Sequence, residues 1–288
     1  MTALKLAIAI ADKEALPSAF VVLRDFEKAI PLAATLGYDG VELALKRADE
    51  IKPDSLQQLL AENQVVVSCL TTGQIYAESG LSFTDADPQS RQKVRVIFRE
   101  LIDLAAQFGQ QVNIGRVRGG IGQRPVAEAE GLFIDLAQEL CAYAAPKGVT
   151  MLLEPVNRYE LDFINSVEEG AALMRKIGQP NMKLLPDVFH MNIEDIHIGE
   201  ELARWVSDIG YVHLADSNRR APGCGHTHFN DIFGHLKSAS YQGWVSVEIL
   251  PIPDPETAAR QAITHLRPLL AAYNETNSQI LTLFQDRL

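Results

Sequence analysis

Short apolar segments and amphipathic helical segments alternate along almost the whole chain, and this alternation limits the folds open to it. Each apolar run has the length of a buried strand, and each is followed by apolar residues at helical spacing. The eight runs cover residues 6–10, 41–45, 65–70, 112–114, 151–153, 182–185, 211–214 and 245–247. Strands that alternate with helices pair in parallel, so the pattern predicts an α/β protein, a (β/α)8 TIM barrel, with a doubly wound open sheet as the alternative.

The length of 288 residues suits one such barrel, because these barrels run to about 250 residues as a single domain. We expect residues 1–288 to form that single domain, with residues 273–288 as a C-terminal helical extension. Four apolar residues in the extension predict that it packs on the barrel or on a second subunit: Ile280, Leu281, Leu283 and Phe284.

Composition argues against several classes of protein. No apolar run reaches the roughly 20 residues that cross a bilayer, so we expect no membrane partner. The net charge of -11 repels a phosphate backbone and disfavours nucleic acid. The three cysteines, Cys69, Cys141 and Cys224, have no C-x-x-C spacing, which suggests neither a disulfide framework nor a Cys-type zinc site and favours the cytoplasm. The first residues predict a buried strand rather than a secretion signal, because charged residues follow at once.

Polar side chains stand at the ends of four of the predicted strands. Glu154, Asp187, His213 and Glu248 each follow or close a separate apolar run. The carboxyl ends of the strands share one face of a barrel, which would bring the four groups together. Three carboxylates and an imidazole are a ligand set for a divalent cation. We find no Gly-rich nucleotide loop and no G-x-S-x-G elbow that would indicate other chemistry.

Four segments, LEPVNRYELDFIN, PDVFHMNIED, VHLADSNRRAPGCGH and VSVEILP, carry a family resemblance. They resemble the sugar isomerase and epimerase family of xylose-isomerase-like TIM barrels, and most of all the D-tagatose 3-epimerase and 5-keto-L-gluconate epimerase group. The resemblance implies one divalent ion, Mn²⁺ first, with Mg²⁺, Co²⁺ or Zn²⁺ as alternatives, and a homodimer or homotetramer. It implies that the ion is held by Glu154, Asp187, His213 and Glu248, and that a sugar or sugar-acid substrate is contacted by His190 and Arg219, with Glu160 beside them.

The chemistry of epimerisation fits this ligand set. Inverting a carbon beside a ketone requires removal of a C–H proton, and the resulting enediolate needs stabilisation where its charge develops. A divalent ion supplies this stabilisation as a Lewis acid. Two carboxylates on opposite faces, Glu154 and Glu248, would let the proton leave one side and return on the other. Which of the two removes it depends on the starting isomer and stays open.

Other functions use the same residues. An aldose–ketose isomerase of the hydroxypyruvate isomerase type would move the carbonyl, and an inosose-type dehydratase would release water. A non-catalytic, metal-dependent sugar-binding protein would keep the ligands without turnover. An abasic-site endonuclease needs several zinc ions and extra histidines, and no histidine precedes His190.

Substrate charge is left open by the sequence. Basic residues follow several strands and predict a cationic mouth that would suit a keto-uronate or sugar phosphate as well as a neutral ketohexose. They are Lys46, Arg47, Arg116, Arg118, Arg158, Arg219 and Arg220. We expect Arg116 to bind substrate. Glu42 is interpreted as a structural hydrogen-bonding group at the mouth, and His226 and His228 as part of a lid or a solvated loop.

Overall fold

The computed structural model describes residues 3–16 and 20–285, and the side chains of residues 276–285 lie outside that description. Eight parallel strands form the barrel wall in the order β7-β6-β5-β4-β3-β1-β9-β8, and a two-residue strand, β2 (Leu23–Arg24), pairs with β1. The wall strands are β1 (Lys5–Ala11), β3 (Gly40–Ala44), β4 (Val66–Thr71), β5 (Gln111–Ile114), β6 (Thr150–Leu153), β7 (Met182–Leu184), β8 (Tyr211–Leu214) and β9 (Trp244–Val247). The predicted (β/α)8 barrel is confirmed, and the short β2 was not anticipated.

The ring closes between β7 and β8 through isolated bridges rather than a continuous ladder. The amide of Gly210 donates to the carbonyl of Leu184 at 2.9 Å, and the amide of His213 donates to the carbonyl of Pro186 at 2.9 Å. One bridge pairs Asp187 with His213. The closure therefore places two of the predicted ligands side by side.

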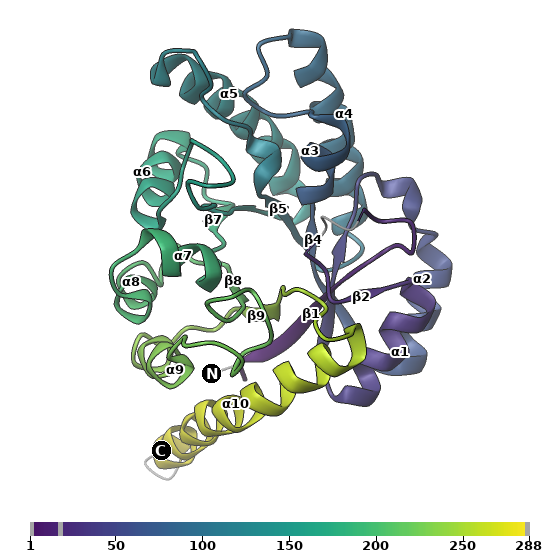
Figure 1. Ribbon diagram of the computed structural model, residues 1–288, viewed down its shortest axis with the longest axis vertical. Helices are drawn as coiled ribbons and strands as arrows, with labels where there is room; N and C mark the ends of the chain where they lie inside the picture. The colour runs from purple at the N-terminus through teal and green to yellow at the C-terminus, as the bar shows by residue number, and fades with distance from the viewer. Residues whose placement is uncertain (1–2, 17–19, 286–288) are drawn as a thin grey trace.

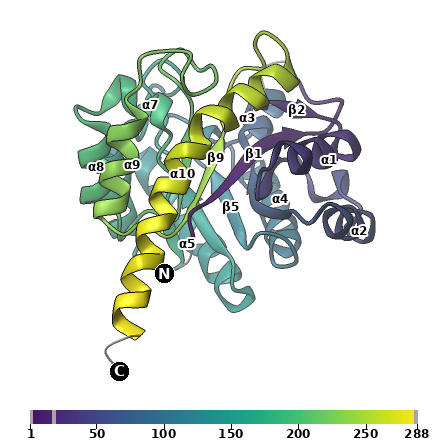
Figure 2. The same cartoon turned by 90° about the horizontal axis from the view of Figure 1, so that it is seen from below.

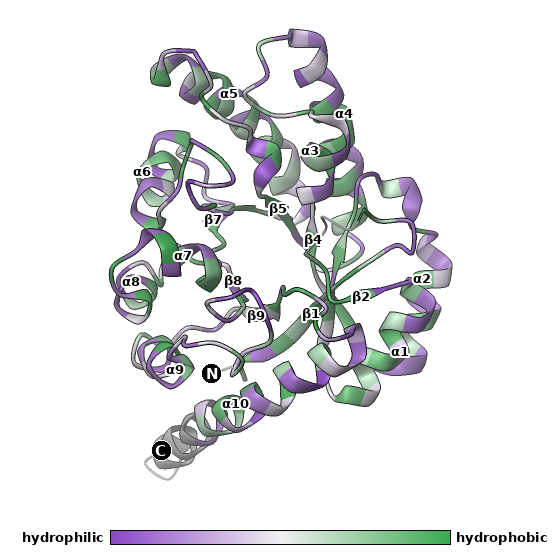
Figure 3. Ribbon diagram, viewed as in Figure 1, coloured by the Kyte–Doolittle hydropathy of each residue, from purple (hydrophilic) through white to green (hydrophobic). Residues whose placement is uncertain are grey.

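Helices surround the strands and shield them from solvent (Figure 1). The outer ring consists of α1 (Phe26–Leu36), α2 (Pro53–Asn63), α4 (Pro88–Ala105), α5 (Val126–Ala144), α6 (Val167–Ile177), α8 (Ile198–Arg204), α9 (Phe229–Ser238) and α10 (Pro255–Gln285). The strands are mostly apolar and hydrophilic residues gather on the outer ring (Figure 3), as expected when parallel strands are buried on both faces. Residues such as Ile8, Leu43 and Val112 are fully buried.

Two further helices lie at the mouth, directly after strands. They are α3 (Gly73–Ser79), after β4, and α7 (Val188–Glu194), after β7. Asp187 is the N-cap of α7, and its Oδ1 accepts the backbone N–H of Phe189 at 2.8 Å. This cap satisfies one of the free N–H groups of the first turn and fixes the Asp187 side chain at the mouth.

The last helix, α10, crosses the outside of the barrel between α9 and α1 (Figure 2). Tyr273 anchors it: the side chain is buried, and its hydroxyl donates to the carbonyl of Tyr241 at 2.5 Å. The packing predicted for Ile280, Leu281, Leu283 and Phe284 falls outside the described side chains. Within the described residues, no helix is both long enough and apolar enough to cross a bilayer.

Candidate active site

The four polar groups predicted at the strand ends lie together at the mouth of the barrel. Glu154, Asp187, His213 and Glu248 each offer one ligand atom, and these atoms lie within 4.8 Å of one another. The Nδ1 atom of His213 is 3.5 Å from Glu154 Oε1 and 3.8 Å from Glu248 Oε2. The convergence follows from the fold, because all four residues stand at the carboxyl ends of strands β6 to β9.

The atoms at this centre fit a divalent cation. Asp187 Oδ2 and His213 Nδ1 are buried and have no hydrogen-bond partner among the described residues. A buried polar atom without a partner is costly, so its presence in a folded protein calls for an explanation. Carboxylate oxygens and an imidazole nitrogen are donors that Mg²⁺, Mn²⁺ and Zn²⁺ accept. We conclude that the residues present fit such an ion.

Glu42, from β3, orients the imidazole of this cluster. Its side chain is fully buried, and Oε2 accepts the Nε2–H of His213 at 3.0 Å. Burial alone would lower the pKa of His213, but the negative charges of Glu42, Glu248 and Glu154 raise it well above its usual value. The hydrogen bond from Nε2 leaves Nδ1 directed at the other carboxylates, as in metal sites where a carboxylate holds a ligand histidine. Glu42 thus has the structural hydrogen bond expected of it.

The two glutamates proposed to carry protons differ in their environments. Burial favours the neutral form of Glu154, yet the positive charge of His213, whose Nδ1 lies 3.5 Å from Oε1, lowers the pKa of Glu154 to about 2. Asn113 also donates to Glu154 Oε2 at 2.7 Å. Burial raises the pKa of Glu248 to about 8 against the attraction of His213 and Arg219. The surroundings of the two carboxyls thus favour different protonation states, and an ion bound between them would favour the charged form of both.

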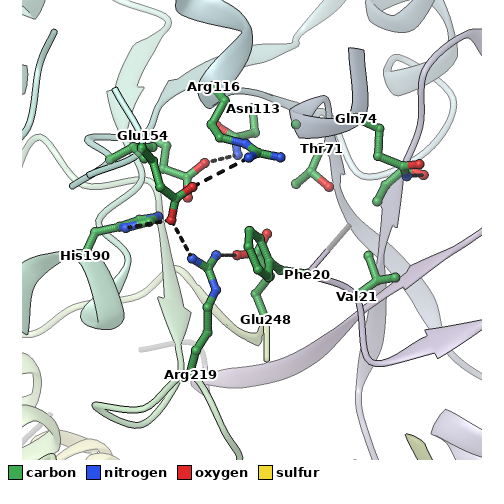
Figure 4. A pocket seen from close by; sticks show the side chains of 14 residues that line it. Phe20, Val21, Thr71, Gln74, Asn113, Arg116, Glu154, His190, Arg219 and Glu248 are labelled. Atoms are coloured by element: carbon green, nitrogen blue, oxygen red, sulfur yellow. Dashed lines mark hydrogen bonds and ion pairs between the residues drawn. The ribbon is translucent and has the colours of Figure 1, made fainter. Parts of the chain in front are cut away.

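A second group of residues lies around the open side of this centre (Figure 4). Arg219 donates to Glu160 Oε1 at 3.1 Å and to Glu248 Oε2 at 2.7 Å, and its guanidinium lies 3.7 Å from the ring centroid of Phe20. The guanidinium of Arg116 lies 3.8 Å from Glu160 Oε2 and makes no hydrogen bond with any residue that the structure describes. The same pocket is lined by His190, so the predicted substrate contacts share one cavity with Glu154 and Glu248.

The predicted cationic mouth is wrong in most of its members. Of its seven residues, Arg116 and Arg219 line the pocket. Arg118 is fully buried and donates to the carbonyls of Glu154 at 2.7 Å and Phe163 at 2.8 Å, so it braces the loop after β6. Three of the others pair with nearby acids away from the pocket: Lys46 binds Glu78, Arg47 binds Asp49 and Arg158 binds Glu194. Position after a strand does not tell where the following turn directs a long side chain.

Sequence reasoning missed three residues of the site. Asn113 lies within β5, one residue before its end, and Asn157 follows β6; both are buried polar groups that contact the predicted residues. A polar residue inside a short apolar strand was an available signal for Asn113. Phe20 carried no such signal, because its place over Arg219 depends on a loop far away in the sequence. His226 and His228 are exposed and do not belong to the metal-ligating group found among the described residues.

The fold and the cluster define a class of α/β barrels with a carboxylate and histidine cluster, fit to hold a divalent cation, at the carboxyl end of the strands. The chain belongs to the xylose isomerase-like TIM barrel family, whose model matches residues 30–269. It is 32% identical over 228 residues to the L-ribulose 3-epimerase of Methylomonas sp. (strain DH-1), covering 77% of each chain. It is 26% identical over 235 residues to a putative hydroxypyruvate isomerase of Homo sapiens, covering 77% of this chain and 83% of that one.

A solved structure gives a comparison over nearly the whole length. The D-allulose 3-epimerase of Methylomonas sp., in complex with D-allulose, matches with a TM-score of 0.77 and 26% identity, covering 93% of this chain and 99% of that one. These relatives are named as sugar epimerases and an isomerase, and the cluster described above could hold a divalent cation.

Proposed function

We propose that the chain inverts the carbon next to the ketone of a ketose or keto-uronate, moving a proton through an enediolate. The observation that carries the proposal is the cluster of Glu154, Asp187, His213 and Glu248, whose ligand atoms lie within 4.8 Å of one another beside an open pocket. The relatives named as 3-epimerases support this reaction class.

In this proposal Glu154 and Glu248 carry the proton. Each belongs to the cluster and also lines the pocket, so a substrate held there lies within reach of both. A divalent ion held by the four residues, Mn²⁺ first and Mg²⁺, Co²⁺ or Zn²⁺ otherwise, would supply Lewis-acid stabilisation of the charge that develops on the ketone oxygen. One glutamate, as a carboxylate, removes the substrate proton, and the other, as a carboxylic acid, donates its own proton to the opposite face. The starting isomer decides the order.

Four residues hold the substrate oxygens in this proposal. Arg219 is fixed by Glu160, Glu248 and the ring of Phe20, so its remaining N–H groups are held in one direction at low entropic cost. His190 and Glu160 line the same cavity. Arg116 brings free N–H donors to the rim, which suits a hydroxyl or a carboxylate of the sugar and keeps both substrate classes in the proposal.

Deuterium exchange tests the proposal. The enzyme, loaded with Mn²⁺, is incubated in D2O with ketohexoses and keto-uronates, and NMR follows deuterium at the carbon beside the ketone. We expect incorporation with inversion for at least one sugar, and its loss when the metal is stripped with a chelator. A chain that incorporates no deuterium with any of these sugars, or that keeps turning over after complete chelation, contradicts the proposal.

An aldose–ketose isomerase is the second candidate, because the similarity to a putative hydroxypyruvate isomerase covers 77% of this chain. The same glutamates would then move the proton between two neighbouring carbons. The NMR spectrum separates the cases: an isomerase yields an aldose, a dehydratase loses a hydroxyl, and a sugar-binding protein shows saturable binding without exchange. The proposal also includes a cytoplasmic location and a homodimer or homotetramer. Analytical ultracentrifugation of the full chain tests the oligomeric state.

A further inference from the structure

Asn157 lies in the loop between β6 and α6 and contacts the ring of His190. Asn157 is 2% exposed, as is His190, which lies in the first turn of α7. The Nδ2 atom of Asn157 is 2.7 Å from Nδ1 of His190. A contact this short between two buried nitrogens must be a hydrogen bond, so one of them donates and the other accepts.

The orientation of the Asn157 amide decides the direction of that bond. Its Oδ1 accepts the backbone N–H of Tyr159 at 3.0 Å, and its Nδ2 lies 3.3 Å from Glu160 Oε1. A flipped amide would set two donors against each other at Tyr159 and two oxygens against each other at Glu160. Two independent partners thus fix which end of the amide faces His190.

An amide nitrogen has two hydrogens and no free lone pair, so Asn157 can only donate. The Nδ1 atom of His190 therefore accepts, and the ring proton of the neutral imidazole is on Nε2. We propose that Asn157 fixes this tautomer and so makes His190 a hydrogen-bond donor, through Nε2–H, to a substrate oxygen in the pocket. The substrate part of this inference rests on the proposed function, whereas the tautomer does not.

The charges around the ring show why Asn157 is needed. Glu160 Oε1 lies 4.0 Å from Nδ1, and Asp187 Oδ2 lies 3.5 Å from Nε2. Each carboxylate attracts a proton to the nitrogen that it faces, so the two oppose each other. The amide supplies a donor to Nδ1 and a second donor to Glu160, and both contacts disfavour a proton on Nδ1.

The inference limits what His190 can do. A ring that accepts at Nδ1 and donates from Nε2 stabilises negative charge on a substrate oxygen, as a neutral imidazole can in an active site. It cannot take the substrate proton through Nε2. The exchange of protons stays with Glu154 and Glu248, and Asn157 is a positioning residue for the donor.

Ring ¹⁵N chemical shifts test the tautomer without any turnover. Long-range ¹H–¹⁵N spectra of the Mg²⁺-loaded protein resolve its seven histidines, and His190→Gln assigns the signal. We expect an unprotonated Nδ1 and a protonated Nε2. In Asn157→Asp the carboxylate can only accept, so the two nitrogens should exchange roles. A protonated Nδ1 in the unchanged protein, or an unaltered tautomer in Asn157→Asp, overturns the inference.

Kinetics test the donor. Loss of one donor to a developing oxyanion costs about 10²–10³ in kcat, and we expect Asn157→Asp to lower kcat by at least about tenfold with KM nearly unchanged. Asn157→Leu, of similar volume and without polar atoms, serves as the test if the Asp variant does not fold. It should give mixed tautomers and a smaller fall of kcat, because part of the molecules keep the Nε2–H donor.

Asn165→Asp is the matched control. Asn165 lies in the same loop and donates to the carbonyls of Val156 at 2.7 Å and Leu161 at 2.8 Å, so its change perturbs the loop without touching His190. The control should keep the tautomer. If kcat falls equally in Asn157→Asp and Asn165→Asp, Asn157 acts only by stabilising the loop, and the inference is overturned. If the unchanged protein shows the predicted tautomer but exchanges no deuterium with any sugar, the proposed function is contradicted and the tautomer inference stands.

Discussion

The two halves of the barrel mouth differ in chemistry. Strands β6 to β9 bring the charged groups that meet at the centre, Glu154, Asp187, His213 and Glu248, whereas strands β1 to β5 bring groups that act on those side chains. Glu42 holds His213, and Asn113 holds Glu154. In Figure 4 the charged residues gather on one side of the pocket, and Val21, Thr71 and Gln74 face them. We call β6 to β9 the reacting half, because it carries the residues proposed to bind metal and move protons, and β1 to β5 the orienting half, because its residues hold those side chains in place. Variants in the two halves should therefore have different effects on catalysis and on metal binding.

The largest effect is expected in the reacting half. Glu154→Gln and Glu248→Gln each keep the shape of the side chain and remove its ability to exchange a proton, so we predict a loss of about 10²–10⁴ in deuterium exchange at saturating Mn²⁺. Glu256→Gln is the control, because Glu256 pairs with Arg260 on the surface. Exchange rates measured by NMR test this prediction. If either site variant retains the rate of the control, the division between the halves fails.

Metal binding by the reacting half should depend strongly on pH. Burial raises the pKa of Asp187 to about 6 and that of Glu248 to about 8, so the folded protein holds protons that a cation must displace. Lowering the pH from 8 to 6 should weaken binding by up to about tenfold per unit for one displaced proton, and more steeply below 6. Calorimetric titration with Mg²⁺ in buffers of different ionisation heat counts the released protons. A binding constant that does not change over this range contradicts the prediction.

Most of the reacting half could be predicted from the sequence. The residues stand at strand ends, and a parallel barrel brings strand ends to one face whatever the loops do. The residues that orient these groups were harder to predict, and one of them, Asn157, follows β6 in the reacting half itself. Asn113 and Asn157 act through hydrogen bonds to side chains on other elements, and Arg118, predicted at the mouth, turns inward to backbone carbonyls. Such contacts depend on loop paths that follow from tertiary packing, and neither spacing nor charge in the sequence reports them.

A change in the orienting half should weaken metal binding without removing a ligand. Glu42→Leu leaves His213 Nε2 without its acceptor, so Nδ1 is no longer held as the metal-facing nitrogen, and we predict a loss of about 10–100-fold in metal affinity. Glu42→Gln keeps an acceptor oxygen and should lose less. Competition with a chelating dye measures both. Ser68→Ala is the control, because Ser68 is equally buried and contacts Tyr211 rather than the centre. Equal losses in Glu42→Leu and Ser68→Ala would mean that burial, not orientation, matters here.

The smallest effect is expected at Asp195. This acid follows α7, in the same part of the chain as the reacting half, and it does not line the pocket. Burial raises the pKa of Asp195 to about 7, with Glu201 and Glu194 adding repulsion, and its Oδ2 has no hydrogen-bond partner among the described residues. Because the folded state holds this proton more tightly than the unfolded state, stability should fall as pH rises from about 4 to 7 and then level off. Asp195→Asn should remove this decline, raise Tm by a few degrees at pH 8 and leave Tm at pH 4 unchanged. Thermal melts at both pH values, with metal affinity as the parallel readout, test it. If Asp195→Asn also changes metal affinity, Asp195 belongs with the reacting residues. A raised carboxyl pKa would then be a property of the site residues alone in this half of the barrel.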